Sequence, residues 1–128
     1  MFTISVVILT MGDRPEDLIT CITSARAQKG IEVEIVLVVN GGTPDLDLAD
    51  VIVKPEGNIG IPKGRNIGAA ASKGEFICFL DDDGALLNEE VFRKAGKYFN
   101  LEEDLAVTSL KIVDENNQTA RRHHSGLI

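Results

Sequence analysis

The stretch FICFLDDDGALL, residues 76–87, joins an apolar segment to a dense group of negative charges. Five uncharged and mostly apolar residues are followed at once by three aspartates and a glycine. The apolar part is typical of a strand that is buried in a parallel sheet. Adjacent carboxylates repel one another, so a bound cation is one reason for the chain to hold them together. The simpler alternative is a solvated acidic turn before the next helix.

Strand and helix patterns alternate along the rest of the chain. Apolar and β-branched runs predict strands over residues 3–9, 33–39, 50–54, 75–80 and 105–113. Helix patterns fall between them, over residues 15–30, 62–73 and 88–99. This alternation predicts a Rossmann-like α/β fold, an open and mostly parallel sheet with helices on both faces. We expect one domain over residues 1–113 and a loop or tail, cut off in mid-course, over residues 114–128.

The first helix pattern carries signals at both ends. Pro15 suits the first turn, Asp13 is the expected cap, and Gly30 can end the helix. We expect one face of this helix to be apolar, with Leu18, Ile19, Ile22 and Ala25. Cys21 and Cys78 fall inside a predicted helix and a predicted strand, so we expect buried free thiols.

Composition and charge limit the classes of function. The chain has 128 residues, 44% of them hydrophobic, and a formal net charge of −7. An acidic protein is a poor match for nucleic acid or an anionic membrane surface, since both require a basic patch. No apolar run reaches the roughly 18 residues of a membrane span. We expect a cytoplasmic protein without nucleic-acid partners; peripheral membrane association and a homo-oligomer stay open.

A glycine-rich segment, EGNIGIPKGRNIGAAASKGE, occupies residues 56–75. Glycines allow the backbone to approach a ligand or another element closely. The polar side chains between them offer hydrogen-bond donors, from Asn58, Lys63, Arg65 and Asn66. The spacing matches neither the G-x-x-x-x-G-K-[ST] phosphate loop nor a G-x-G-x-x-G directly after the first strand. ATPases and dinucleotide oxidoreductases are therefore poor candidates.

The three aspartates fall where an open α/β sheet binds ligands, beyond the carboxyl end of a strand. If the extended conformation persists, Asp81 and Asp83 project to one side and Asp82 to the other. Mg²⁺ and Mn²⁺ are commonly held by one or two carboxylates together with substrate phosphates. Asp81 and Asp83 are thus the candidate ligands for Mn²⁺ or Mg²⁺.

Three segments in order, VVILTMGDRP, EIVLVVNGGT and NIGIPKGRNIGAAASKGEFICFLDDD, resemble the nucleotide-sugar-binding half of family-2 glycosyltransferases with the GT-A fold. The resemblance covers about residues 3–113. It implies transfer of a sugar from a nucleoside-diphosphate sugar to an unknown acceptor, with a divalent metal as Lewis acid. By position, it implies nucleotide-sugar contacts from Thr10, Asp13, Arg14, Asn40, Asn58, Lys63, Arg65, Asn66, Asp81 and Asp82. It also implies metal binding by Asp81 and Asp83.

The sequence departs from the family pattern in two ways. Val39 takes the place of an aspartate that reads the base and cannot accept from a uracil N–H, which argues against a UDP-sugar. Asn40 can read another base, and GDP- and dTDP-sugars stay open. No residue matches the position of the family's general base, so the catalytic residue is unknown. One alternative is a non-catalytic nucleotide-binding or interaction module that lacks the acceptor half. A phosphotransfer receiver domain and a sugar nucleotidylyltransferase are weaker alternatives.

Overall fold

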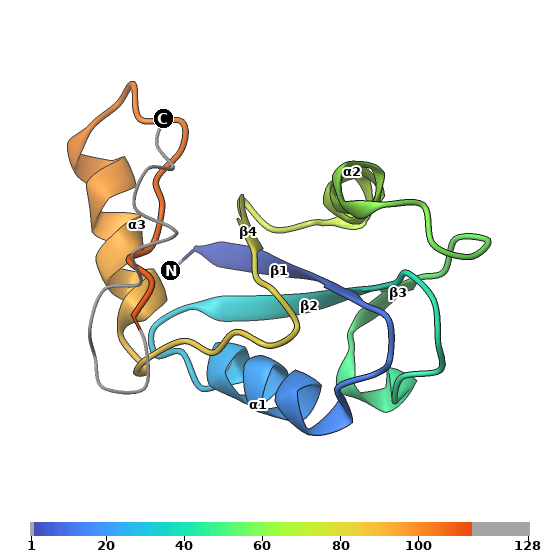
Figure 1. Cartoon of the computed structure of the whole chain (residues 1–128). Coiled ribbons are helices and arrows are strands. Elements are labelled where there is room, and N and C mark those ends of the chain that lie inside the picture. Colours follow the sequence, from blue (N-terminus) through green and yellow to red (C-terminus); the bar gives the residue numbers. More distant parts are fainter. Residues whose placement is uncertain (1, 114–128) are drawn as a thin grey trace. The chain divides into compact units, whose positions relative to one another are not determined.

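A computed structural model of the chain describes residues 2–113, so the predicted tail lies outside the described residues. Figure 1 shows its elements in chain order, β1 (Thr3–Thr10), α1 (Pro15–Arg26), β2 (Glu32–Val39), the short 3-10 helix η1 (Leu46–Leu48), β3 (Val51–Val53), α2 (Ile61–Ala71), β4 (Phe76–Phe79) and α3 (Val91–Leu101). The chain divides into two compact units, Met1–Lys94 and Ala95–Ile128. The first unit contains the whole sheet with α1 and α2. None of the helices described has the length and apolar character that crossing a membrane requires.

The four strands form one parallel sheet in the order β3-β2-β1-β4. The interior strand β1 pairs with the other interior strand, β2, along its whole length, from Thr3 opposite Glu32 to Thr10 opposite Val39. The edge strand β4 pairs with the other side of β1. The predicted open α/β fold is confirmed, and every pairing in the sheet is parallel.

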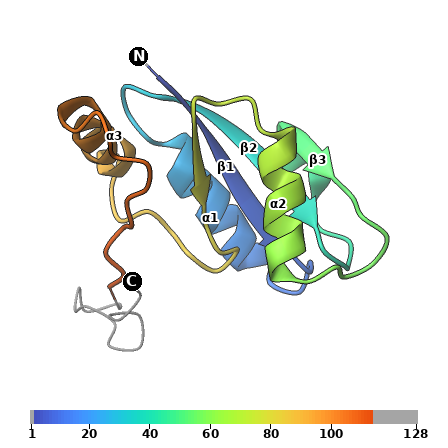
Figure 2. The same cartoon turned by 90° about the horizontal axis from the view of Figure 1, so that it is seen from above.

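Helices α1 and α2 cover opposite faces of the sheet, as Figures 1 and 2 show. Successive residues of a strand point to opposite faces, and the two core clusters follow this alternation. Val6 and Ile8 of β1 pack in the cluster that includes Leu18 of α1. Val7, between them, packs in the cluster that includes Ile67 of α2. Both faces are therefore apolar, which explains the nearly continuous β-branched run in β1.

Helix α2 packs on the sheet through glycines. A Cβ on Gly64 would lie 2.6 Å from Cδ2 of Leu9, and a Cβ on Gly68 would lie 2.5 Å from Cγ1 of Val7. Both distances are shorter than real Cβ contacts. Part of the glycine-rich segment thus serves close packing between a helix and the sheet.

The first helix differs from the prediction at its ends and on one face. Its N-cap is Arg14, without a side-chain capping bond, so the prediction of Asp13 as the cap is wrong. The helix ends at Arg26, before Gly30. Ile19 is 49% exposed, because it lies beside the stripe that packs on the sheet rather than within it. The buried residues of the helix are Leu18, Cys21, Ile22 and Ala25.

The predicted strand over residues 105–113 is wrong. Residues 105–112 form neither helix nor strand, and Val113 forms an isolated bridge. Strand propensity reflects packing against neighbouring strands, and an apolar run by itself does not specify such a neighbour.

Candidate functional site

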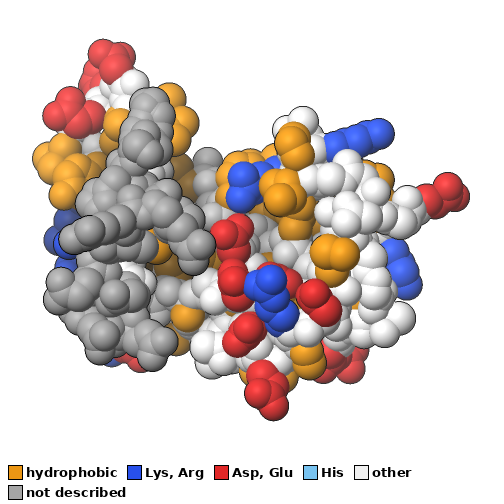
Figure 3. Space-filling model, viewed as in Figure 1, with side chains coloured by type: hydrophobic (Ala, Val, Ile, Leu, Met, Phe, Trp, Pro, Cys, Tyr) orange, Lys and Arg blue, Asp and Glu red, His pale blue; other side chains and the backbone are white. Residues whose placement is uncertain are grey.

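Polar side chains collect where the parallel strands end. Thr10 closes β1, Asn40 follows β2, and the aspartates follow β4. Helix α2 begins at the same edge, because it connects the end of β3 to the start of β4. Figure 3 shows acidic side chains gathered around a basic one near the middle of the visible face. The carboxyl edge of the sheet is therefore the candidate site.

The three aspartates form a turn rather than an extension of β4. The strand ends at Phe79, and the backbone N–H of Gly84 donates to the carbonyl oxygen of Asp81 at 2.9 Å. The condition for alternating side chains, an extended acidic segment, is therefore not met, since a turn does not alternate its side chains as a strand does. Asp82 lies against β1, where its Oδ2 accepts a hydrogen bond from Oγ1 of Thr10 at 2.9 Å.

The other two aspartates each face an arginine. Nη1 of Arg14 lies 2.7 Å from Oδ2 of Asp83, and Nη2 of Arg65 lies 3.5 Å from Oδ1 of Asp81. The Arg65 guanidinium also lies over the ring of Phe79, 5.7 Å from its centroid. Both ion pairs are close to half exposed or more, and such pairs contribute about 0–1 kcal/mol. A ligand with comparable charge can thus replace either partner at small cost.

Six of the residues that the sequence predicted for the site are therefore in contact across three elements and their loops, namely Thr10, Arg14, Arg65, Asp81, Asp82 and Asp83. Asn40 has a different place. It is buried, its Oδ1 accepts from the N–H of Ile59 at 2.8 Å, and its Nδ2 donates to the carbonyl oxygen of Gly60 at 3.4 Å. Its amide thus holds the loop that leads into α2. The remaining predicted residues are exposed, Asp13, Asn58, Lys63 and Asn66.

A cysteine supports the acidic turn from α1, a contact that the sequence did not predict. Sγ of Cys21 donates to the carbonyl oxygen of Asp81 at 3.3 Å. Burial, together with the negative charge of Asp82, raises the pKa of the Cys21 thiol to about 12. Burial also raises the pKa of Cys78 to about 11. Both thiols are protonated at neutral pH, so Cys21 acts as a hydrogen-bond donor and not as a nucleophile.

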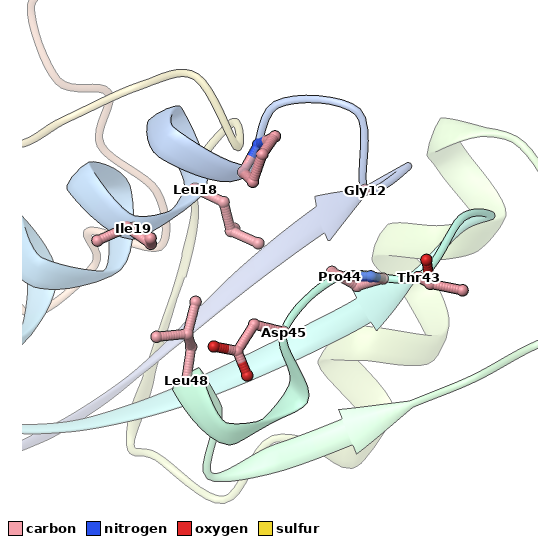
Figure 4. Close-up of a pocket in the computed structure, with 8 residues that line it drawn as sticks. Gly12, Leu18, Ile19, Thr43, Pro44, Asp45 and Leu48 are labelled. Atoms are coloured by element: carbon pink, nitrogen blue, oxygen red, sulfur yellow. The ribbon is translucent and has the colours of Figure 1, made fainter.

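A small cavity of about 70 Å³ lies beside this edge, between the start of α1 and the loop after β2. Figure 4 shows Leu18 and Ile19 on one side of it and Pro44, Asp45 and Leu48 on the other. Its volume accommodates a few water molecules and not a nucleotide. A ligand of nucleotide size at this edge would therefore have to lie on the open surface over the strand ends.

A larger hollow of about 430 Å³ lies at the opposite edge, where the strands begin. Glu34 and Lys73 line it, but Oε1 of Glu34 already accepts from Oγ of Ser5 and from the N–H of Lys73. In open α/β sheets ligands bind at the carboxyl ends of strands, where the polar residues collect here. The volume of a hollow alone is thus a poor guide to the ligand site, and the acidic turn remains the candidate site.

This arrangement, a parallel α/β sheet with carboxylates on a turn beyond one strand, defines a class that binds ligands at the strand ends. The chain belongs to glycosyl transferase family 2, whose sequence profile matches residues 5–127. No curated protein matches the chain. The predicted family is confirmed.

Solved structures of S. aureus TarS resemble the chain in fold. TarS 1-349 matches with a TM-score of 0.67 and 20% identity, over 88% of this chain and 40% of that chain. TarS 1-349 in complex with UDP matches with a TM-score of 0.65 and 19% identity, over 91% of this chain and 43% of that chain. TarS 1-349 in complex with UDP-GlcNAc matches with a TM-score of 0.64 and 19% identity, over 90% of this chain and 39% of that chain. The chain thus spans less than half the length of these proteins.

Proposed function

We propose that this chain is the part of a glycosyltransferase that binds the nucleoside-diphosphate sugar donor. The observation that carries the proposal is the contact of Thr10, Arg14 and Arg65 with three consecutive aspartates at the carboxyl edge of the sheet. Membership of glycosyl transferase family 2 supports the reaction class. Two of the solved structures similar in fold contain UDP or UDP-GlcNAc, which supports a nucleotide sugar as the ligand.

We propose that Asp81 and Asp83 bind Mn²⁺ or Mg²⁺ together with the diphosphate. No group of three acidic, histidine or cysteine side chains among residues 2–113 could hold a metal by itself. The residues present nevertheless fit these ions, which prefer oxygen ligands and often take one or two carboxylates plus substrate phosphates. The side chains of Asp81 and Asp83 are 74% and 50% exposed, so their oxygens are accessible. A bound cation supplies Lewis-acid stabilisation of the negative charge on the leaving diphosphate.

The protein's own side chains have separate tasks in this proposal. Arg14 and Arg65 neutralise the carboxylates before the ligand binds and then turn toward the diphosphate, which offers more acceptor oxygens. Thr10 keeps Asp82 against the end of β1, so the turn retains its position when the arginines move. Asn40 contributes through the loop before α2, because both atoms of its amide already have backbone partners.

Thermal stability tests the proposal and identifies the base. The purified chain is heated with UDP, GDP, dTDP, CDP or ADP, each with and without Mn²⁺. A ligand at about 100 times its Kd stabilises by about 2.7 kcal/mol, enough to raise Tm by several degrees. We expect one nucleotide to do so in a metal-dependent way.

Two variants make the assay specific. Asp83→Asn removes one proposed metal ligand and should abolish the metal-dependent rise. Asp47→Asn removes one exposed carboxylate from η1, outside the site, and should retain the metal-dependent rise in Tm. No rise with any nucleotide, or an equal rise in Asp83→Asn and the unchanged chain, would show that the acidic turn is not a metal-dependent donor site.

A further inference from the structure

Three polar side chains on the α1 side of the sheet contact the loop that follows β4. Cys21 and Ser24 belong to α1, and Gln28 follows shortly after the last helical residue, Arg26. Cys21 and Ser24, three residues apart, lie on the same face of the helix. Cys21 is fully buried and Gln28 is 6% exposed. Buried polar groups require partners, and most of the partners of these three side chains lie in residues 81–92.

The first two side chains form a continuous chain of hydrogen bonds under the acidic turn. Sγ of Cys21 donates to the carbonyl oxygen of Asp81 at 3.3 Å. Oγ of Ser24 donates to the carbonyl oxygen of Cys21 at 2.7 Å and accepts from the N–H of Leu86 at 3.0 Å. The turn is thus attached to α1 at the first of its three aspartates and again three residues after the last.

The amide of Gln28 continues the attachment toward α3. Its Nε2 donates to the carbonyl oxygen of Asn88 at 2.6 Å, and its Oε1 accepts from the N–H of Phe92 at 2.9 Å. The two atoms of this buried amide therefore hold one backbone group of the loop, at Asn88, and one in the first turn of α3, at Phe92. A buried polar network with all of its groups paired makes the bonded segment rigid.

Regular secondary structure does not perform this task for residues 81–90, which lie between the end of β4 and the start of α3. The carboxylates of the turn have other partners, since Thr10 binds Asp82 and Arg14 binds Asp83. The arginine contact is exposed, whereas the contacts from α1 are largely buried. The more permanent attachments of the turn are therefore those to α1 and to the buried Thr10.

We propose that Cys21, Ser24 and Gln28 are positioning residues that fix the backbone of the acidic turn and thereby set its affinity for a divalent metal with a nucleoside diphosphate. This inference rests on the proposed function. Carboxylate ligands must be held within about 0.5 Å of their working geometry, which a loop achieves only through supporting contacts. Side chains that orient metal ligands typically change metal affinity about 10- to 100-fold when they are removed.

The first measurement is amide hydrogen exchange of the free chain, which requires no ligand. Ser24→Ala removes the acceptor for the Leu86 N–H, and Ser24→Thr retains it. Ile22→Val is the control, because Ile22 is a buried residue of the same helix with an apolar role. We expect exchange at Gly84 and Leu86 to rise about fivefold or more in Ser24→Ala alone. The amide of Gly60, which is held by Asn58, should be unchanged in all three variants.

The second measurement is the Kd of the nucleotide selected by thermal stability, with and without Mn²⁺. We expect Ser24→Ala and Gln28→Met to raise the Kd measured with Mn²⁺ about tenfold over that of the unaltered chain. The Kd measured without Mn²⁺ should stay within about twofold of the value for the unaltered chain. Ser24→Thr should restore the affinity, and Ile22→Val should retain it. Gln28→Met preserves the length and volume of the side chain, and Ser24→Ala removes one atom, so one variant suffices if the other does not fold.

The outcomes separate this inference from the proposed function. Unchanged exchange at Gly84 and Leu86 in Ser24→Ala overturns the inference, whatever the nucleotide results. Increased exchange with an unchanged metal-dependent Kd also overturns it, because the role of these side chains would then be structural only. If the unaltered chain binds no nucleotide, the proposed function is wrong and the inference about affinity is wrong with it, while the exchange data still report the attachment of the turn.

Discussion

Replacing Gly42 with alanine tests the contact between the loops that follow β1 and β2. Gly42 has a φ of 70°, and a Cβ on it would lie 1.9 Å from the carbonyl oxygen of Met11. The obstacle is backbone, so the two loops must separate. We expect about 1–2 kcal/mol of left-handed strain and about 1–3 kcal/mol more from the displaced loop.

Gly57→Ala is the matched control for this change. Gly57 has a φ of 69°, and a Cβ on it would have nothing within 4 Å. It therefore carries the same backbone strain without the collision, and the difference between the two variants isolates the cost of separating the loops.

Urea unfolding followed by circular dichroism measures that difference. With a slope of about 2 kcal/mol per molar urea, the extra cost of about 1–3 kcal/mol in Gly42→Ala should lower its midpoint by roughly 0.5–1.5 M relative to Gly57→Ala. Gly42→Ala should also weaken nucleotide binding, since Met11 adjoins Thr10. Equal midpoints for the two variants would refute the reasoning that this close approach is a strict requirement of the fold.

Three further predictions follow from single contacts. Gly68→Ala should lower the urea midpoint, because about 1–3 kcal/mol of overpacking against Val7 exceeds the gain of about 1 kcal/mol in helix propensity; a higher midpoint would contradict the packing of α2. Arg14→Gln should raise the affinity of the nucleotide-free chain for Mn²⁺ up to about fivefold, because the exposed cation competes for Asp83; electron paramagnetic resonance titration measures this, and weaker binding would contradict it. The raised thiol pKa values of Cys21 and Cys78 favour the folded state fully below pH 9.0 and progressively less as pH rises toward 12. The urea midpoint should therefore fall more steeply between about pH 8 and about pH 10.5 in the unaltered chain than in the Cys21→Ala, Cys78→Ala double variant, and parallel slopes would contradict this.

The sequence predicts the sheet and its two covering helices well, because these depend on local periodicity. The apolar run of β1 is buried on both faces, and the strand before the aspartates ends within one residue of its predicted end. Periodicity alone does not predict which residues at the margin of the apolar face are buried. Ile19 is exposed, because the width of the buried stripe depends on how α1 packs. The run over residues 105–113 shows the same limit for strands, which require a neighbour as well as an apolar pattern.

Six of the eleven residues predicted for the candidate site lie in contact at the carboxyl edge, but the sequence did not predict their contacts. Asp81, Asp82 and Asp83 follow a strand, and the pattern alone favours alternation of their side chains. The hydrogen bond from Gly84 to Asp81 bends the chain instead, and three separate partners then orient the carboxylates. Gln28 carried no signal of its contact with this loop, because its partners are backbone groups sixty or more residues away.

Paramagnetic NMR with Mn²⁺ tests the central claim most directly, because it locates the metal relative to individual amides. A ¹⁵N-labelled chain is titrated with Mn²⁺ in the presence of the selected nucleoside diphosphate, and Mg²⁺ provides the diamagnetic reference. The account predicts that the amides of Asp82, Asp83 and Gly84 broaden first, together with that of Gly12 beyond β1. Broadening centred instead on Glu34 and Lys73, at the opposite edge of the sheet, would contradict it, as would the absence of any localised broadening.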